Sequence, residues 1–187
     1  METKSSFWKI ISYNGLICAS ILILLGVLYY LFDVNYFNFA FIGINYLITL
    51  TITIVFMVIG THQYRDKVLS GKINYGYKLL TVFLIGLIAF VVSSIFSFFF
   101  NNLVASDILL KQMDDFIYSM EERGLSEDQL TEIRNEIEMQ FSNAYSLGSR
   151  FIHFLINLRI LTVIMAVISL IVAAIIKSDS TISKEVV

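Results

Sequence analysis

The sequence has no proline, a single cysteine and little charge. Without proline, no helix can be kinked by a proline ring. One cysteine, Cys18, excludes an intrachain disulfide and any metal site made of cysteines alone, and we expect it to pack as a small hydrophobic side chain. Charged residues make up 15% of the chain and the formal net charge is −2, which is too small to indicate binding to nucleic acid.

Apolar residues are abundant instead. They make up 57% of the 187 residues, and the mean hydropathy is +0.78. Ordinary soluble domains contain roughly 45–50% apolar and about 25% charged residues. This excess indicates a protein that is embedded in lipid. The length suits one membrane domain, residues 1–187, and nothing in the composition marks a second folding unit.

Four apolar windows are long enough to cross a bilayer as helices, which takes about 20 residues. They lie at about residues 10–32, 39–59, 79–100 and 160–176. The first is too long for the apolar part of a secretory signal, so we expect an uncleaved anchor. The fourth is the shortest, and we expect its helix to begin earlier, near Phe151. Because the windows lack the alternation of β-barrel strands, the predicted fold class is an all-α integral membrane protein with four transmembrane helices.

Lysine and arginine are distributed unequally between the two ends of these helices. The short segments at one end carry Lys4, Lys9, Arg65, Lys67, Lys72, Lys78, Lys177 and Lys184. The short turn at the other end has none, and the remaining basic residues lie in one long segment. Because basic residues near helix ends stay in the cytoplasm, we expect both termini to be cytoplasmic.

The long segment, residues 101–150, is predicted to be an acidic helical hairpin outside the cytoplasm. Its first half has an apolar stripe at helical spacing and ends at Gly124; the stripe is Leu109, Met113, Phe116, Ile117 and Met120. Its second half begins with a capping box, Ser126 and Gln129, and a hydrophobic staple, Leu125 and Leu130. The second stripe continues through Leu130, Ile133, Ile137, Phe141 and Tyr145. We expect the stripes to pack on each other; the alternative is that either lies on the outer leaflet.

The remaining candidate residues lie at the ends of the predicted spans, and residues 178–187 are predicted to form a short tail. Residues 60–78 are basic and aromatic, which favours lipid contact through Tyr64, Arg65, Lys67, Lys72 and Lys78. Arg159, at the outer end of the fourth window, either snorkels to headgroups or pairs with Asp33 or another outer carboxylate, to lock the bundle or hold an anion. Phosphate-binding loops and catalytic motifs are missing, so we expect no catalytic residue, metal or cofactor.

Inside the windows the side chains carry no charge, which disfavours an ion-coupled carrier. The polar groups there include Thr49, Thr51, Thr53, Ser93, Ser94, Ser97 and Ser169. Serine and threonine bond to their own helix or to a neighbouring helix, so we expect a packing role. A path for a solute is the alternative.

Several short motifs resemble a family of small four-span bacterial membrane proteins, domain of unknown function 4199. They are Tyr64-Arg65-Asp66 after the second window, Gly71, Ile73 and Tyr75-Gly76 before the third, Met120, Gly124 and Ser126-Glu127 in the hairpin, and the ending Leu170 to Lys177. The resemblance covers nearly the whole chain. It implies a multi-pass protein of the bacterial inner membrane, and it implies no catalytic residues because the family has no assigned activity.

Two functional hypotheses follow. The first is a non-enzymatic inner-membrane protein that contacts membrane lipids and associates with a second copy or another membrane protein. The association would use the surface of the bundle or the exterior hairpin. The alternative is a subunit or small carrier for an uncharged or lipid-like solute, using the serine and threonine face of the second and third helices.

Overall fold

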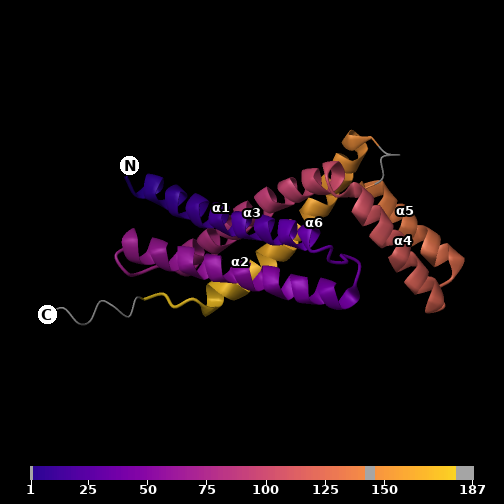
Figure 1. The fold of residues 1–187 in the computed structure, drawn as a ribbon. Helices are drawn as coiled ribbons and strands as arrows, with labels where there is room; N and C mark the ends of the chain where they lie inside the picture. The colour runs from indigo at the N-terminus through magenta and orange to yellow at the C-terminus, as the bar shows by residue number, and fades with distance from the viewer. Residues whose placement is uncertain (1, 142–145, 180–187) are drawn as a thin grey trace. The chain divides into compact units, whose positions relative to one another are not determined.

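The computed structural model describes residues 2–141 and 146–179. In this part the chain is helical without any β-strand (Figure 1), and its helices are α1 (Glu2–Leu31), α2 (Phe39–Lys67), α3 (Tyr75–Leu103), α4 (Ser106–Glu122), α5 (Glu127–Phe141) and α6 (Leu147–Ile175). Helices α1, α2, α3 and α6 are long and apolar enough to cross a membrane. The predicted fold class is therefore confirmed, as an all-α integral membrane protein with four transmembrane helices and a helical hairpin between the third and the fourth.

Asparagine side chains cap the N-termini of two transmembrane helices, α2 and α3. Oδ1 of Asn38 accepts a hydrogen bond from the backbone N–H of Ala40 at 3.0 Å, and Oδ1 of Asn74 accepts one from the N–H of Tyr77 at 2.9 Å. Such a cap satisfies N–H groups that have no partner within the helix. Helix α2 continues beyond residue 59 and α3 begins before residue 79. Apolar windows predict only the lipid-facing part of a helix, whereas its caps decide where it begins and ends.

The chain forms two compact units, of which the first consists of Met1–Leu22, Ile48–Ser93 and Ile160–Val187. Its buried core contains Ile11, Met57, Val82, Ile85, Met165, Val172, Ala173 and Ile176. Gly15 of α1 lies directly against α3, because a Cβ added to this glycine would be 2.8 Å from Cβ of Ile88. Small residues allow such close helix contacts in membranes, where dispersion forces replace much of the hydrophobic effect.

The second unit consists of Ile23–Leu47 and Ser94–Arg159. In it, the ring of Phe98 on α3 packs against Phe151 and Phe154 on α6, with centroid distances of 5.4 and 5.0 Å. Helices α4 and α5 lie side by side (Figure 1) and bury a shared apolar cluster of Met113, Ile117, Met120 and Leu130. The predicted packing of the hairpin stripes on each other is therefore confirmed for these side chains. The side chains of Ile137, Phe141 and Tyr145 lie outside the described residues.

The turn of the hairpin follows the predicted chemistry. Gly124 has a φ of +86°, which is a conformation that glycine adopts without strain after the end of a helix. The backbone N–H of Ser126 donates to Oε1 of Gln129 at 3.2 Å, and the N–H of Gln129 donates to Oγ of Ser126 at 3.5 Å. Leu125 packs against the cluster that contains Leu130. The capping box and the hydrophobic staple are confirmed.

The predicted tail, residues 178–187, begins with two residues that are bonded to the connection between α2 and α3. The backbone N–H of Ile73 donates to the carbonyl oxygen of Ser178 at 3.0 Å, and Lys72 forms an isolated antiparallel bridge with Asp179. Residues 180–187 lie outside the described residues. The chain beyond α6 therefore first runs along the α2–α3 connection.

Candidate functional site

The basic segment that ends α2 and begins α3 divides into buried and exposed residues. Tyr64, Arg65 and Lys78 are buried, with exposed fractions of 5%, 7% and 5%, whereas Lys67 and Lys72 are exposed. Buried cations are found in proteins when their hydrogen bonds are satisfied. The burial of Arg65 and Lys78 therefore requires hydrogen-bond partners within the protein. Lys67 and Lys72 are instead free to contact solvent or lipid headgroups.

Arg65 and Lys78 donate hydrogen bonds to the backbone that directly follows α6. We call this pair the α6 clamp. Nη1 of Arg65 donates to the carbonyl oxygens of Lys177 at 3.1 Å and Asp179 at 3.4 Å. Nζ of Lys78 donates to the carbonyl oxygen of Ile176 at 2.7 Å. These carbonyls lie just beyond Ile175, the last residue of α6, where the negative end of the helix dipole favours cations. The clamp thus gives both buried cations a structural role.

Asp66 and Tyr75 complete the surroundings of the clamp. The guanidinium of Arg65 donates to both carboxylate oxygens of Asp66, at 2.7 and 3.1 Å, which is the bidentate geometry typical of strong arginine–carboxylate pairs. Nζ of Lys78 lies 5.8 Å from the centre of the Tyr75 ring, and the Tyr75 hydroxyl donates to the carbonyl oxygen of Leu170 at 3.3 Å. These contacts tie α2, α3 and α6 together within the first unit.

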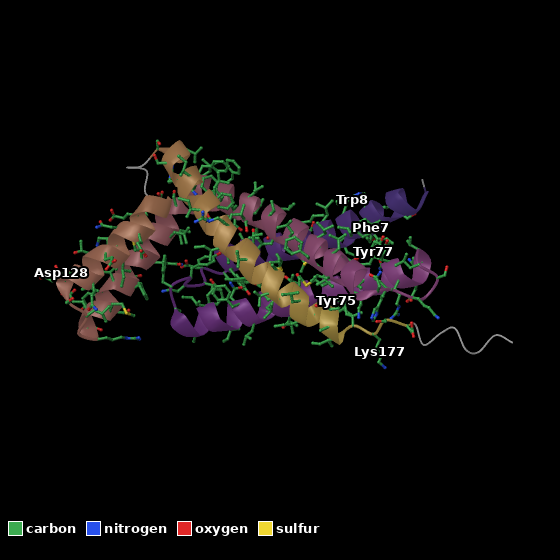
Figure 2. The ribbon with its side chains drawn as sticks, turned by 180° about the vertical axis from the view of Figure 1, so that it is seen from behind. Phe7, Trp8, Tyr75, Tyr77, Asp128 and Lys177 are labelled. Carbon is green, nitrogen blue, oxygen red and sulfur yellow. The ribbon has the colours of Figure 1, made fainter. Side chains whose placement is uncertain are left out.

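Aromatic rings gather in the same unit. Phe7 contacts Trp8 and Tyr64, and Tyr64 contacts Tyr77, with centroid distances of 5.6, 4.8 and 6.4 Å. Figure 2 shows Phe7, Trp8 and Tyr77 close together. Trp8 and Tyr77 are 52% and 48% exposed. Exposed aromatic residues are typical of the membrane–water interface, and lipid contact by the exposed Lys67 and Lys72 of the same unit stays a prediction.

Arg159 is exposed on α6. Between the described residues, the ion pairs are Arg65–Asp66 and Arg134–Asp114, and the alternative pair of Arg159 with Asp33 is not among them. Oδ1 of Asp33 instead accepts a hydrogen bond from Nε2 of Gln112 at 3.4 Å. Arg159 directly precedes the apolar window of residues 160–176, but α6 begins twelve residues earlier, at Leu147. A long arginine side chain can snorkel to headgroups, and this role of Arg159 stays a prediction.

Hydroxyl groups in the transmembrane helices bond to their own helices. Carbonyl oxygens three or four residues earlier accept from Thr53, Thr61, Thr81, Ser93 and Ser169. A hydroxyl that donates to its own backbone does not offer its hydrogen to a passing solute. This arrangement favours the packing role over a polar path through the bundle.

Asn14 is a buried polar residue that the sequence analysis missed. Its Nδ2 donates to Oε1 of Gln63 at 3.0 Å and to the carbonyl oxygen of Ile10 at 2.8 Å, which joins α1 to α2. An asparagine near the start of an otherwise apolar window was the available signal. Amide side chains hydrogen-bond between helices in membranes, so this pair stabilises the first unit.

Gln112 is a second residue that the sequence analysis missed, and it holds α4 to the connection between α1 and α2. Its Oε1 accepts from the backbone N–H of Tyr36 at 3.0 Å, and its Nε2 donates to the carbonyl oxygen of Val34 at 3.3 Å as well as to Asp33. The residue is 7% exposed and follows the buried Leu109 at helical spacing. A polar residue within an apolar stripe was the signal. Its side chain satisfies backbone groups that the short connection leaves without partners.

Tyr36, next to this contact, is also hydrogen-bonded. Its hydroxyl donates to the carbonyl oxygen of Gly26 on α1 at 3.1 Å. Burial, together with nearby Tyr29, raises the pKa of the Tyr36 hydroxyl above its usual range. The hydroxyl therefore stays protonated and remains a donor at physiological pH.

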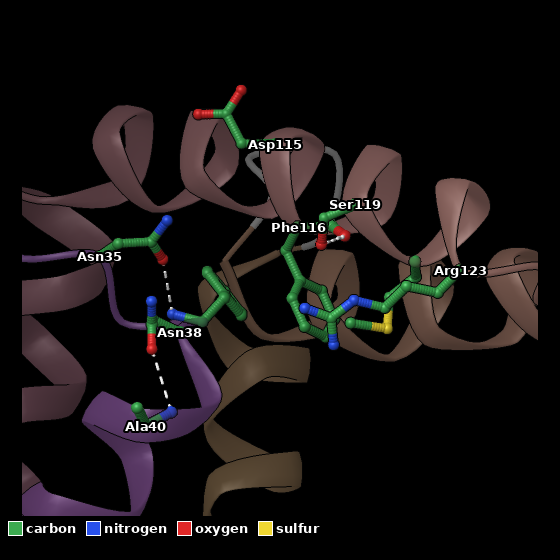
Figure 3. A pocket seen from close by; sticks show the side chains of 9 residues that line it. Asn35, Asn38, Ala40, Asp115, Phe116, Ser119 and Arg123 are labelled. Atoms are coloured by element: carbon green, nitrogen blue, oxygen red, sulfur yellow. Dashed lines mark hydrogen bonds between the residues drawn. The ribbon is translucent and has the colours of Figure 1, made fainter.

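A pocket of about 460 Å³ lies beside Gln112 in the second unit, between the α1–α2 connection and α4. Its lining residues are Asn35, Phe37, Asn38, Ala40, Asp115, Phe116, Ser119, Met120 and Arg123. Figure 3 shows the side chains of Asn38, Phe116 and Arg123 around this space. The sequence predicts no site here, because the pocket joins two segments that lie far apart along the chain.

The described side chains contain no group of three or more His, Cys, Asp or Glu residues that could hold a metal ion. The largest concentration of acidic residues, on the hairpin, is spread over exposed helix faces. The polar groups of the described side chains thus consist of amides, hydroxyls and single charged groups.

These features define the class of the protein as a multi-pass, all-α membrane protein with a helical hairpin. A family model described as "Protein of unknown function (DUF4199)" matches residues 13–178, so the chain belongs to this family. The family suggested by the sequence motifs is thereby confirmed. No curated protein and no solved structure matches the chain.

Proposed function

We propose that the protein acts by protein–protein association through the α4–α5 hairpin. The observation that carries this proposal is the packing of the hairpin: its apolar stripe is buried within the hairpin, and its outer faces are acidic. Exposed acidic residues there are Asp107, Asp114, Asp115, Glu121, Glu122, Glu127, Asp128, Glu132 and Glu136. Figure 2 marks Asp128 at the start of α5.

This surface suits a protein partner better than a lipid surface. An interfacial helix needs an apolar face to insert between headgroups, and the α4 stripe already packs on α5. Acidic groups are also repelled by anionic lipid headgroups. Tyr118, which is 63% exposed on α4, adds a large amphipathic side chain of the kind enriched at binding hot spots. The hairpin therefore favours a partner protein with a basic surface.

The proposed orientation has both termini in the cytoplasm and the hairpin outside it, in the inner membrane of a bacterium. Its support is the bias of lysine and arginine toward one end of the spans: the start of α1, the end of α2, the α2–α3 connection, the start of α3 and the chain after α6. We also propose that the chain is not an enzyme, because its sequence contains no phosphate-binding loop, Gly-x-Ser-x-Gly or His-Glu-x-x-His motif.

Photo-crosslinking tests the association. A photoreactive phenylalanine at Tyr118 is expected to give a discrete crosslinked product with another protein in intact cells. The same group at Phe32, which is 76% exposed outside the hairpin, is the matched control. Because the proposed contact is electrostatic, Glu121→Lys together with Glu122→Lys should lower the yield at position 118 at least fivefold. Absence of a product at 118, or a product that the charge reversal leaves unchanged, contradicts the proposal.

A further inference from the structure

The pocket between the α1–α2 connection and α4 shares only Asp115 with the acidic surface of the proposed association. Residues 116, 120 and 123 line it, whereas Tyr118 lies on a different face of α4, since successive residues are about 100° apart around a helix of 3.6 residues per turn. Its volume of about 460 Å³ falls in the range of sites for small molecules, roughly 300–1,000 Å³. The chemistry of its wall restricts what it can hold.

Two asparagine amides in the wall are oriented by the backbone. Oδ1 of Asn35 accepts from the N–H of Phe37 at 2.9 Å, and Oδ1 of Asn38 accepts from the N–H groups of Ala40 at 3.0 Å and Phe41 at 3.2 Å. These bonds fix which end of each amide is oxygen. The NH₂ ends, each with two donors, are thus left for other partners, and Figure 3 shows them on the sides of the amides that face away from these bonds.

The groups opposite the asparagines add positive charge and an apolar wall. The Arg123 side chain reaches toward the Phe116 ring, whereas the Asp115 carboxylate points away from Asn38 (Figure 3). A guanidinium carries five donors in a planar fork that matches a carboxylate. Phe37 and Phe116, whose centroids are 5.7 Å apart, and Met120 supply the apolar part. The pocket wall therefore combines amide donors and a positive charge with an apolar surface and with one carboxylate, Asp115.

We propose that this pocket binds a small organic carboxylate with an apolar body. The carboxylate accepts hydrogen bonds from the amide NH₂ groups of Asn35 and Asn38 and is attracted by the positive charge of Arg123. The apolar body lies against Phe116 and Met120. A neutral ligand of the same shape lacks the charge that the donors recognise, and a cation is repelled by the guanidinium.

Binding of phenylacetate tests this site. The full chain in lipid nanodiscs is equilibrated with radiolabelled phenylacetate, and empty nanodiscs correct for partition into lipid. Saturable binding at one molecule per chain is expected, and phenylacetamide, its neutral isostere, should compete at least tenfold more weakly. Binding that does not saturate, or equal competition by the amide, overturns the proposal.

A matched pair of variants assigns the binding to the pocket. Asn38→Asp keeps the size of the side chain and the helix cap, since aspartate caps as well as asparagine, but it replaces the donors with a negative charge. Asn135→Asp makes the same change on the exposed surface of α5. At least a tenfold loss of affinity is expected for the first and none for the second.

A third variant, Ser119→Phe, fills the pocket without changing charge and should abolish binding. Circular dichroism and thermal unfolding of each variant report whether the fold is kept. Equal affinity of Asn38→Asp and Asn135→Asp, or full binding by folded Ser119→Phe, places phenylacetate elsewhere and refutes the site.

Discussion

Because Gly15 of α1 lies directly against α3, a larger residue at position 15 should lower the stability of the protein by an amount that can be predicted. In Gly15→Ala the new Cβ would be 2.8 Å from both Cβ and Cγ2 of Ile88 and 3.2 Å from the carbonyl oxygen of Ile85. A β-branched side chain in a helix has one strongly preferred rotamer, so Ile88 cannot turn aside. The backbone carbonyl cannot move without its helix. The two helices must therefore separate.

Overpacking typically lowers the free energy of unfolding by about 1–3 kcal/mol. The higher helix propensity of alanine over glycine raises it by about 1 kcal/mol. Gly26→Ala, on the same helix, gains the same propensity and meets nothing within 4 Å. The difference between the two variants isolates the packing term. We expect Gly15→Ala to be about 1–3 kcal/mol less stable than Gly26→Ala, which is about 5- to 150-fold in the unfolding equilibrium constant.

A third glycine refines this prediction. At Gly86 the nearest atoms to an added Cβ belong to the ends of the flexible side chains of Met57 and Met165. Gly86→Ala should therefore lie between the other two. Unfolding by sodium dodecyl sulfate in mixed micelles, followed by far-ultraviolet circular dichroism, measures all three free energies. If Gly15→Ala and Gly26→Ala agree within about 0.5 kcal/mol, the close contact of α1 and α3 is refuted.

Three further predictions concern the clamp, the hairpin contact and the orientation. Arg65→Met removes donors to the carbonyls beyond α6, so amide hydrogen exchange of residues 73 and 176–179 should become at least fivefold faster; unchanged exchange contradicts the clamp. Gln112→Leu removes the side-chain hydrogen bonds to the α1–α2 connection, and limited proteolysis of that connection should become at least fivefold faster, which equal cleavage of the two proteins would disprove. In a Cys18→Ala background, an impermeant maleimide should label a cysteine at position 127 from outside intact cells but one at 70 only after lysis, and the reverse pattern overturns the proposed orientation.

The sequence alone predicted the features that depend on a few neighbouring residues. Apolar windows predicted the four membrane helices, and Gly124 with Ser126 and Gln129 predicted the turn and the second helix of the hairpin. Hydropathy and helix caps act over a few turns of chain, so they can be read without knowing the tertiary contacts. The window that starts at residue 39 agrees with the start of α2, whereas the continuation of α2 to Lys67 and the start of α3 at Tyr75 lie outside the apolar windows, in polar sequence.

The candidate site was only partly predictable. The sequence singled out the basic residues near the ends of α2 and α3 but could not separate Arg65 and Lys78, which hold the end of α6, from Lys67 and Lys72, which are exposed. The distinction depends on the path of residues 176–179, about a hundred positions further along the chain. Identical charges at similar spacing thus acquire different roles through packing.

The sequence by itself thus determined that this chain lies in a membrane, how many helices cross it and where a hairpin interrupts them, because these follow from local hydropathy and capping. Only the tertiary structure decided that Gln112 holds the α1–α2 connection, that the α6 clamp exists and that a pocket opens beside α4. Each of these joins residues from distant parts of the chain, and its energy appears only once the helices have packed.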